Sequence, residues 1–416
     1  MTLAPRIAFP PPRVRRRRRV ALYSHDTQGL GHLRRNLMIA EALAGGDDAP
    51  AILLLSGAIQ LRLFALPPAA DCVTLPALRK DVDGTYAAES LHLSLEEVVA
   101  LRSATIEAAV TAFAPDVLIV DKVARGSFSE LEPTLAALAA RDDARVVLGL
   151  RDVLDAPTAA RREWAQDRTS EAVERYYDQV WVYGDRRVYD PVLAYGLPDA
   201  VARKVTFTGY LGGPGRLASH GNLPPPADAY VLCAVGGGQD GYALGAAFAE
   251  ARMPHGVVGV LLCGPYMPDA ARQDLERRAA ATDRLRVMRF SADPGPLVAN
   301  ARAVVGMAGY NTAVELMCAG VPALLVPRVE PRLEQLVRAA RLAELGLVDA
   351  LHPDDASPAA LTRWIAGAVT ATRPRRADRP GKAVDLEGLA RLPGLVASLT
   401  GAPGLFGVRG GLDRAC

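Results

Sequence analysis

The sequence predicts an α/β protein made of two doubly wound domains that face each other across a cleft. Short apolar runs alternate with stretches of helical periodicity along almost the whole chain, and this order is typical of parallel sheets covered by helices. A length of 416 residues exceeds one ordinary core and suits two domains of roughly 200 residues each. A segment dense in glycine and proline, 208–230, divides the chain into two halves with the same alternation, as an interdomain linker would.

The first half contains six candidate strands, separated mostly by helical stretches: Val20–Ser24, Ala51–Leu55, Val117–Val120, Arg145–Leu150, Gln179–Tyr183 and Val205–Phe207. A long helix among them, LSLEEVVALRSATIEAAVTAF, ends at APD because proline disfavours the α conformation in the residue before it. In the second half the predicted strands are 230–235, 257–263, 286–288, 301–306 and 323–327, and the last predicted helix is Leu386–Leu399. We expect a disordered basic arm over 1–19, a first domain over 20–210, a linker over 211–229, a second domain over 230–385, and a C-terminal helix and tail over 386–416.

Composition excludes several functional classes. The chain is 50% hydrophobic and 23% charged, which suits a soluble enzyme and not a disordered chain. Its net charge is only +2, so no global field attracts nucleic acid. The five cysteines are far apart and four lie in apolar text, which indicates buried thiols in a reducing cytoplasm and neither disulfides nor a metal site. No apolar run reaches the ~20 residues of a membrane span, and no signal peptide is recognisable, so a cytoplasmic location is expected.

An arginine run, RVRRRRRV at 13–20, follows the proline-rich FPPPR. We interpret it as a solvated leader. The alternative is attraction to anionic lipid at the inner face of the membrane, where each basic side chain near the surface contributes ~1 kcal/mol. Nucleic acid is a weaker third interpretation.

Ligands of open parallel sheets bind beyond the carboxyl ends of the strands, and the text VVGMAGYNTAVELMCAGVPALLVP, 304–327, contains such a strand end. Thr312 and Glu315 have the spacing of a capping box, which predicts that a helix begins at Thr312. Gly306 and Gly309 would let a ligand approach the backbone, and the N–H groups and positive dipole end of the helix suit a diphosphate. Glu315 therefore has two interpretations, as a capping partner and as a carboxylate for a ribose.

The next helix lies in VPRVEPRLEQLVRAARLAELGLV, 326–348. Its predicted buried stripe consists of Leu333, Leu336, Val337, Ala340 and Leu345. Glu334 and Gln335 fall in its first turn, where a carboxylate and an amide could bind sugar hydroxyls. Ordinary first-turn acidity, which the helix dipole favours, is the alternative.

The text YSHDTQGLGHLRRN, 23–36, places two histidines and an aspartate directly after the first strand. Gly29 and Gly31 permit a tight turn, and the helix that follows is expected to bury Leu33, Leu37 and Ala40. His32 would then lie at a helix N-terminus facing the cleft.

These motifs carry a resemblance that covers most of the chain. GYNTAVELMCAGVPALLVP followed by EPRLEQLVRAARLAELGL resembles the donor-sugar signature of MurG-type glycosyltransferases, family 28, which have the GT-B fold, and 230–351 is similar to that family in order and spacing. SHDTQGLGHLRRNLMIAEAL is similar to the family's N-terminal glycine loop. The text YSHDTQGLGHLRRN, with GPYMP and GYNT, resembles most closely an uncharacterised branch of predicted bacterial glycosyltransferases, so the acceptor cannot be copied from peptidoglycan synthesis.

The resemblance implies an inverting, metal-independent transferase that moves a hexose-type sugar from a UDP-sugar, or another nucleotide sugar, to an acceptor hydroxyl. It places the donor on the second domain, where Glu315 would bind the ribose and Glu334 and Gln335 the sugar. The donor-site residues that it implies are Gly236, Gly237, Gly238, Phe290, Gly309, Tyr310, Asn311, Thr312, Glu315, Glu334 and Gln335. Gly238 stands where the family usually has a small hydroxyl residue, and SADPGP after Phe290 departs from the usual acidic pair with methionine, which affects base specificity.

His32 is the candidate general base, because a neutral imidazole could accept the proton of the acceptor hydroxyl. Asp26, His25 and Asp121 are its rivals. The alternative for His32 is a hydrogen bond to the loop or to an acceptor phosphate. No cofactor is expected besides the nucleotide sugar as co-substrate, and the acceptor is expected to be lipid-linked or a saccharide.

Two other functions remain open at this level. A nucleotide-sugar epimerase or hydrolase of the same fold would need several acids and bases around the sugar, and His25, Asp26, Asp121 and Asp152 all follow first-half strands. A non-catalytic nucleotide-sugar-binding protein is the other alternative. No metal is expected at the donor site, and the text DVD at Asp81–Asp83 is interpreted as a loop motif.

Overall fold

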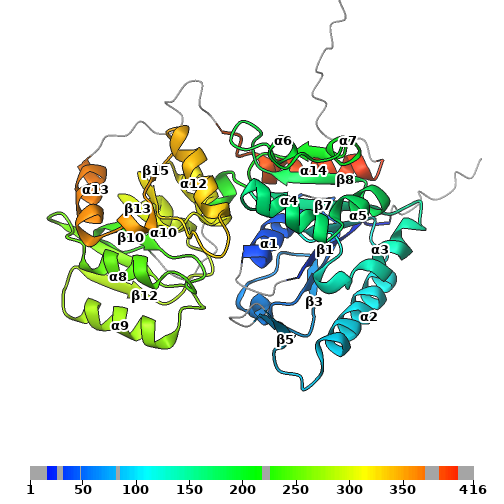
Figure 1. Cartoon of the computed structure of the whole chain (residues 1–416), viewed down its shortest axis with the longest axis horizontal. Helices are drawn as coiled ribbons and strands as arrows, with labels where there is room; N and C mark the ends of the chain where they lie inside the picture. Colours follow the sequence, from blue (N-terminus) through cyan, green and yellow to red (C-terminus); the bar gives the residue numbers. More distant parts are fainter. Residues whose placement is uncertain are drawn as a thin grey trace, which may run out of the picture.

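The computed structural model describes residues 16–25, 31–46, 48–80, 85–217, 225–370 and 384–401. Two parallel sheets form its two halves (Figure 1). The first has the order β3-β2-β1-β6-β7-β8-β9 and the second the order β12-β11-β10-β13-β14-β15. The predicted fold class of two doubly wound α/β domains is confirmed.

The strands of the first sheet are β1 (Arg19–Ser24), β2 (Ala51–Ser56), β3 (Ala70–Thr74), β6 (Val117–Asp121), β7 (Arg145–Arg151), β8 (Gln179–Tyr183) and β9 (Val205–Phe207). Those of the second sheet are β10 (Ala229–Ala234), β11 (Val257–Leu262), β12 (Leu285–Met288), β13 (Ala303–Gly306), β14 (Ala323–Leu325) and β15 (Asp349–Ala350). The antiparallel hairpin of β4 (Leu78–Lys80) and β5 (Tyr86–Ala88) stands apart from both sheets.

The helices of the first half are α1 (Gly31–Ala44), α2 (Leu95–Phe113), α3 (Glu132–Ala139), α4 (Pro157–Gln166), α5 (Thr169–Tyr176), α6 (Pro191–Tyr195) and α7 (Asp199–Ala202). The later helices are α8 (Tyr242–Glu250), α9 (Asp269–Ala280), α10 (Gly295–Asn300), α11 (Tyr310–Ala319), α12 (Glu334–Glu344), α13 (Pro358–Thr370) and α14 (Gly388–Leu399). Short 3-10 helices are η1 (Ile59–Leu63), η2 (Ser127–Ser129), η3 (Pro214–Leu217) and η4 (Pro353–Asp355).

Each sheet has one point where the strand order reverses. In the first sheet β1 pairs with β2 on one side and with β6 on the other. In the second sheet β10 pairs with β11 and with β13 in the same way. Ligands of doubly wound sheets bind outside the carboxyl ends of the strands at such switch points, so the loops after β1, β6, β10 and β13 are the first places to look for a site.

The predicted strands all occur, but the sequence reading missed four short ones. β3, β4, β5 and β15 have two to five residues each. β3 and β15 lie at sheet edges, where a strand is buried on fewer sides and its sequence is less apolar. The text ADCVT of β3 is only half-buried or exposed, which explains why no apolar run marks it.

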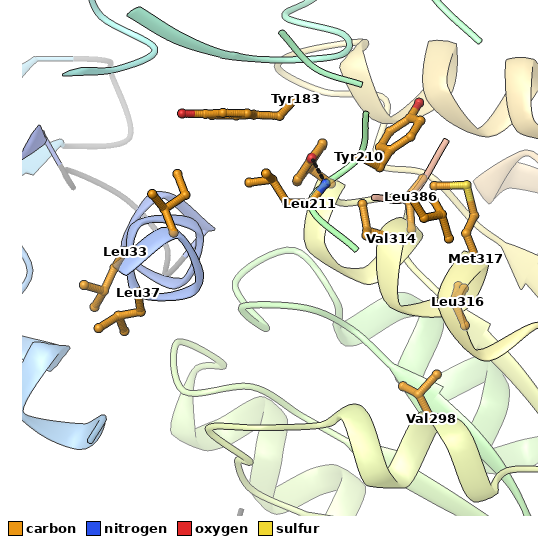
Figure 2. Close-up of a cluster of buried hydrophobic side chains, with 14 of the residues drawn as sticks. Leu33, Leu37, Tyr183, Tyr210, Leu211, Val298, Val314, Leu316, Met317 and Leu386 are labelled. Carbon is orange, nitrogen blue, oxygen red and sulfur yellow. Dashed lines mark hydrogen bonds between the residues drawn. The ribbon is translucent and has the colours of Figure 1, made fainter. Parts of the chain in front are cut away.

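The last helix packs against the first half of the molecule. Contacts join α14 to α1, and the N–H of Gly388 donates to the carbonyl of Tyr210 at 2.9 Å. A continuous cluster of buried apolar residues includes parts of both sheets together with α1, α11 and α14. Figure 2 shows part of this cluster, with Leu211 and Leu386 beside Val314 of α11. The two halves are therefore joined by a shared apolar core as well as by polar contacts.

The arginine run belongs partly to the folded first half. Arg16, Arg17 and Arg19 donate hydrogen bonds of 2.7 Å to the backbone carbonyls of Ala114, Ala49 and Phe113, respectively. The carbonyls of Phe113 and Ala114 lie at the C-terminus of α2, where basic groups are favoured by the helix dipole. The predicted arm over 1–19 is thus wrong for its last four residues, and residues 1–15 lie outside the described part.

The predicted linker, 211–229, also makes structural contacts. Leu211 is buried and pairs with Glu387 in an isolated antiparallel bridge. Arg216 donates to the carbonyl of Asn311 at 2.9 Å, and Ala229 already belongs to β10. Where the structure describes it, this segment is part of the junction between the halves.

Two further sequence expectations concern cysteines and membranes. Cys233 and Cys263 are buried thiols, as predicted, and Cys72 and Cys318 are partly buried. Cys416 lies outside the described residues.

Within the described ranges, no helix has the length and apolar character needed to cross a membrane.

Candidate active site

His32 and Asp121 meet at the switch point of the first sheet. Asp121 ends β6, and His32 is the second residue of α1, which follows β1. His32 Nδ1 hydrogen-bonds Asp121 Oδ2. Arg35, one helical turn after His32, donates from Nε to Asp121 Oδ1 at 2.7 Å and from Nη2 to Asp121 Oδ2 at 2.6 Å. The sequence did not single out Arg35, although its spacing of three residues from His32 puts both side chains on one face of the helix.

At pH 7 Asp121 and Arg35 are charged and His32 is neutral. Burial opposes the ionisation of Asp121, but the charge of Arg35 and the bonds from His32 and Arg35 hold the pKa of Asp121 well below its usual range. Burial lowers the pKa of His32 to about 4, against the opposing effect of Asp121. Arg35 Nη2 lies 2.9 Å from His32 Nδ1 and adds to this lowering. His32 is therefore neutral at pH 7, with its hydrogen on Nδ1 and its Nε2 available as a proton acceptor.

His25 stands beside His32 at the end of β1. Their ring centroids are 4.5 Å apart, and no described group hydrogen-bonds the buried Nδ1 of His25. Burial, followed by the neighbouring His32, lowers the pKa of His25 well below its usual value. Both predicted histidines are thus neutral at pH 7, and both lie next to Asp121.

The predicted capping box in α11 is wrong. The helix begins at Tyr310, its N-cap residue is Gly309, and no side chain caps it. A capping box needs Glu at the third helical position, whereas Glu315 is the sixth residue of this helix. The helix ends as expected, with Gly320 at φ 65°. Among the described residues no group accepts a hydrogen bond from the N–H groups of 310–312, so this helix end is available to an anion.

Glu315 is paired across the junction. Its Oε1 accepts a hydrogen bond of 2.7 Å from Arg34 Nη2, and Arg216 Nη2 lies 3.6 Å from the same oxygen. The Glu315 side chain is only 4% exposed. Arg34 comes from α1 of the first half, so Glu315 links the two halves, and it is not a capping residue.

Tyr310 and Asn311 also hold the two halves together. The phenol of Tyr310 accepts a hydrogen bond of 3.1 Å from the N–H of Leu211, and the guanidinium carbons of Arg35 and Arg338 lie 5.7 and 5.8 Å from the centroid of its ring. Asn311 Nδ2 donates to the carbonyl of Gly31 at 3.2 Å. The N-termini of α1 and α11 therefore lie next to each other, and their positive dipole ends reinforce one another.

The buried face of α12 is different from the predicted stripe. Leu333 is exposed, Ala340 is exposed, and Leu336, Val337 and Leu345 are only partly buried. The buried residues are Glu334, Gln335, Arg338, Ala339 and Leu342. The polar side of the helix is inside because α12 packs against charged groups of the first half. The spacing of four residues between Glu334 and Arg338 is the sequence signal that could have indicated this face.

Glu334 and Gln335 are brought together by Arg328, which follows β14. Arg328 Nη2 donates to Glu334 Oε1 at 2.8 Å, and the Arg328 N–H donates to Gln335 Oε1 at 3.1 Å. Glu334 Oε2 is buried and has no hydrogen-bond partner among the residues that the structure describes. A buried carboxylate oxygen without a donor is costly, and a ligand hydroxyl would satisfy it.

The glycine loop after β10 has the backbone that the sequence suggested. Gly236 and Gly238 have φ of 63° and 90°, values that glycine adopts without strain. A Cβ on Gly238 would also lie 2.2 Å from the carbonyl oxygen of Cys263. Phe290 follows β12 and meets Phe64 of the first half edge-on, with ring centroids 6.4 Å apart. Because β10, β12 and β13 are parallel, these residues and the start of α11 follow the same edge of the second sheet.

A buried ion pair joins the halves beside this site. Arg338 Nη2 donates to Asp152 Oδ1 at 2.6 Å, and both side chains are fully buried. Arg332 holds Glu163 of α4 through bonds of 2.7 and 2.8 Å. Sequence reasoning placed Asp152 at a strand end but did not find its arginine, because the two residues are 186 positions apart.

Some predicted residues cannot be placed. Asp26 and Gly29 lie outside the described residues, as do Asp81–Asp83. Gly31 is the first residue of α1 and has no atom within 4 Å of a Cβ position. In the described ranges, no group of three or more histidine, cysteine, aspartate or glutamate side chains could hold a metal ion.

Residues 247–377 match the sequence profile described as the glycosyltransferase family 28 C-terminal domain. No curated protein matches the sequence of this chain. Many solved structures have a similar fold, among them the following three. The glycotransferase of kitacinnamycin has 16% sequence identity and a TM-score of 0.56 and covers 92% of this chain and 97% of its own. The glycosyltransferase VinC in complex with dTDP has 15% identity and a TM-score of 0.53, with coverages of 92% and 95%. A putative UDP-N-acetylglucosamine 2-epimerase from Listeria monocytogenes has 13% identity and a TM-score of 0.57, with coverages of 91% and 96%. The shared fold is GT-B, with two Rossmann-like domains.

Proposed function

Because its second half carries a glycosyltransferase family 28 domain on a GT-B fold, we propose that this protein is an inverting, metal-independent glycosyltransferase. It moves a hexose-type sugar from a UDP-sugar, or another nucleotide sugar, to an acceptor hydroxyl. One observation carries the proposal: His32, held by Asp121, lies at the switch point of the first sheet, while the uncapped N-terminus of α11 lies at that of the second.

His32 acts as the general base of this reaction. Its Nε2 removes the proton of the acceptor hydroxyl while that oxygen attacks the anomeric carbon. The bond from the anomeric carbon to the diphosphate oxygen breaks, and the nucleoside diphosphate leaves with the electron pair. Asp121 orients the imidazole through Nδ1 and stabilises the imidazolium that forms, and Arg35 keeps Asp121 ionised.

The donor diphosphate binds at the N-terminus of α11. Its negative charge is attracted by the free N–H groups of 310–312 and by the dipoles of α1 and α11. Arg34 and Arg216 add two cationic groups at this place. The same groups stabilise the charge that develops on the leaving diphosphate. Gly236 and Gly237 contribute backbone N–H groups from the neighbouring loop, whereas the N–H of Gly238 donates to the carbonyl of Val235 at 3.1 Å.

The sugar of the donor binds at the start of α12. A sugar hydroxyl donates to the unpartnered Oε2 of Glu334, and Gln335 Nε2 is a donor for another sugar oxygen. Glu315 accepts hydrogen bonds from the ribose, and Phe290 contacts the base. The dTDP in the VinC structure supports a nucleoside diphosphate as ligand class and leaves UDP as a proposal.

A nucleotide-sugar epimerase is the second candidate. The structural similarity to a putative UDP-N-acetylglucosamine 2-epimerase and the pair His25 and His32 favour it. Transfer accounts better for the proton chemistry, because the dyad provides one oriented base and the neighbouring acids Asp152 and Glu163 are held in ion pairs with Arg338 and Arg332. The acceptor, which we propose to be lipid-linked or a saccharide, remains to be identified.

Release of free UDP from UDP-sugars, with and without candidate acceptors, tests the function. Acceptor-dependent release of UDP together with a glycosylated product supports transfer. Release without an acceptor indicates hydrolysis, and isomerisation of the sugar indicates an epimerase. The donor is identified first by screening nucleotide sugars for those that stabilise the protein against thermal unfolding. A ligand at 100 times its dissociation constant adds about 2.7 kcal/mol to the free energy of unfolding.

Replacing Glu315 by Gln is expected to weaken UDP binding roughly 10- to 100-fold, because a hydrogen bond to a charged group contributes about 1.5–3 kcal/mol. Calorimetric titration with UDP measures the effect. The Glu344→Gln variant, in an exposed ion pair on α12, is the matched control. Inorganic pyrophosphate separates ribose binding from a structural role, since it should bind Glu315→Gln at least as well as wild type. Equal losses for UDP and pyrophosphate would refute the ribose assignment.

Turnover is expected to persist in excess EDTA. Arg34, Arg216 and the α11 N-terminus already provide the positive charge that a metal would supply to the leaving diphosphate. Initial rates with and without EDTA, after dialysis against the chelator, measure this. Loss of turnover that Mg²⁺ or Mn²⁺ restores would contradict the proposed mechanism.

A further inference from the structure

Two basic residues lie at the carboxyl ends of neighbouring strands of the first sheet. Lys122 comes directly after β6, and Arg151 is the last residue of β7. The Lys122 N–H donates to the carbonyl of Gly149 at 2.8 Å, so the two strand ends are in register. Both residues therefore lie at the carboxyl edge of the sheet, where Asp121 holds His32.

Arg151 has no anionic partner in the described part of the chain. Its Nε is buried without a hydrogen bond, and among the described residues no carboxylate forms an ion pair with its guanidinium. The nearby acids already accept from other arginines: Asp152 from Arg338, and Glu334 from Arg328 through Oε1, which leaves Glu334 Oε2 without a donor among the described residues. Burial lowers the pKa of Arg151 to about 10, against the opposing charge of Glu334 and with smaller contributions from Arg35 and Arg338, so the group is still cationic at pH 7.

Lys122 is only weakly paired. Its nearest carboxylate oxygen is Glu163 Oε1 at 3.7 Å, and Arg332 already holds Glu163 through two shorter bonds. The backbone of Lys122 has φ of 66°, a conformation that costs a non-glycine residue energy and occurs often at functional sites. Its side chain is 14% exposed.

An incompletely paired, largely buried cation is costly, because the desolvation of its charge is not offset by a partner. An anionic ligand would remove this cost. The guanidinium of an arginine matches the oxygen pair of a carboxylate or phosphate, and a lysine adds a point charge. Arg151 also lies close enough to His32 to lower the pKa of its imidazole, so the anion would bind next to the proposed base.

We propose that Lys122 and Arg151 bind an anionic group of the acceptor, a phosphate or a carboxylate, beside His32. The inference rests on the proposed function, since it assigns the site to the acceptor. The donor diphosphate has its own cations, Arg34 and Arg216, at the N-terminus of α11. Lys122 and Arg151 belong instead to the sheet that carries the base, so an anion there would hold the acceptor with its hydroxyl near His32 Nε2.

Inorganic phosphate is the probe, titrated into the full-length protein saturated with UDP and followed by ³¹P line broadening. Saturation with UDP occupies the donor site, so the broadening reports a second site. Phosphate affinity should fall at least tenfold in Arg151→Met and in Lys122→Met, and Arg151→Lys should recover part of it. Arg162→Met, which removes an exposed arginine of α4, is the matched control and should bind phosphate like wild type.

Equal phosphate affinity in wild type and Arg151→Met would overturn the inference. The midpoint of thermal unfolding separates binding from folding. Arg151→Met should be at least as stable as wild type without phosphate, because it removes an unpaired buried charge. A clear loss of stability would mean that Arg151 has a structural partner, which contradicts the inference.

Comparison of UDP-glucose with UDP-glucuronate distinguishes an acceptor anion from a donor carboxylate. An Arg151→Met variant with the wild-type ratio of the two affinities supports the acceptor. A tenfold selective loss for UDP-glucuronate would assign the anion to the donor and overturn the proposal. Failure of wild type to bind UDP or any other nucleoside diphosphate would refute the proposed function and the acceptor assignment together. Binding of UDP with Arg151-independent phosphate binding would refute this inference alone.

Discussion

Replacing His32 by Ala should lower the turnover number about 100-fold or more and leave the affinity for the nucleotide sugar nearly unchanged. General base catalysis typically contributes about 10²–10⁴-fold, and His32 lies on the first sheet, whereas the donor residues lie on the second. Steady-state kinetics with the identified acceptor and calorimetry with the donor measure the two effects separately.

His255→Ala is the control for this experiment, because His255 is exposed in the loop before β11. It should retain wild-type turnover. Near-normal turnover of His32→Ala would remove His32 from the mechanism, and the base would then be sought at His25 or Asp26. Asp121 is a poor base, since both of its oxygens accept bonds from Arg35, but Asp121→Asn should lower turnover by disturbing the imidazole tautomer.

The pH profile provides an independent readout of the same residue. A histidine with its pKa lowered to about 4 is neutral above that pH and becomes protonated only below it. The acid limb of kcat/KM should therefore lie near pH 4, and the rate should stay constant between pH 5.5 and 7. An ordinary histidine, with pKa near 6.5, would lose most of its base form over that interval. Such a loss would contradict the buried dyad.

Replacing Arg338 by Met should lower the free energy of unfolding by about 3–5 kcal/mol, because it leaves Asp152 as a buried charge without its partner. Both side chains are fully buried, and only two uncharged donors would remain on Asp152 among the described residues, the Tyr210 hydroxyl at 3.0 Å and the Val153 N–H at 2.7 Å. Urea denaturation, followed by tryptophan fluorescence, measures the change as a shift of the midpoint.

The double variant Asp152→Asn with Arg338→Met tests whether the loss comes from the unpaired charge. It should be more stable than Arg338→Met alone, because no buried charge remains. Arg277→Met, which breaks an exposed ion pair on α9, should change stability by at most about 1 kcal/mol. If Arg338→Met behaves like this control, the ion pair does not hold the two halves together.

The strands of the fold could be predicted because their apolar runs are local. Gln179–Tyr183 and Val205–Phe207 agree with β8 and β9 residue for residue. The failures have physical causes as well. β3 is an edge strand without an apolar run, and the face that α12 buries is polar because its partners are the charged residues of the other half. Local periodicity contains no information about a partner more than 150 positions away.

The candidate site also has features that the sequence predicts and features that it does not predict. By itself the sequence determined that glycine turns and helix N-termini follow β10 and β13, and that His32 opens the helix after β1, because turn and helix signals act over a few residues. Only the tertiary structure decided that Asp121 and Arg35 hold His32, that Arg34 pairs with Glu315, and that Lys122 and Arg151 are left without full partners. The reason is that burial and charge pairing depend on which strand ends and helices meet. That meeting is set by the packing of the two sheets against α1, α11 and α12.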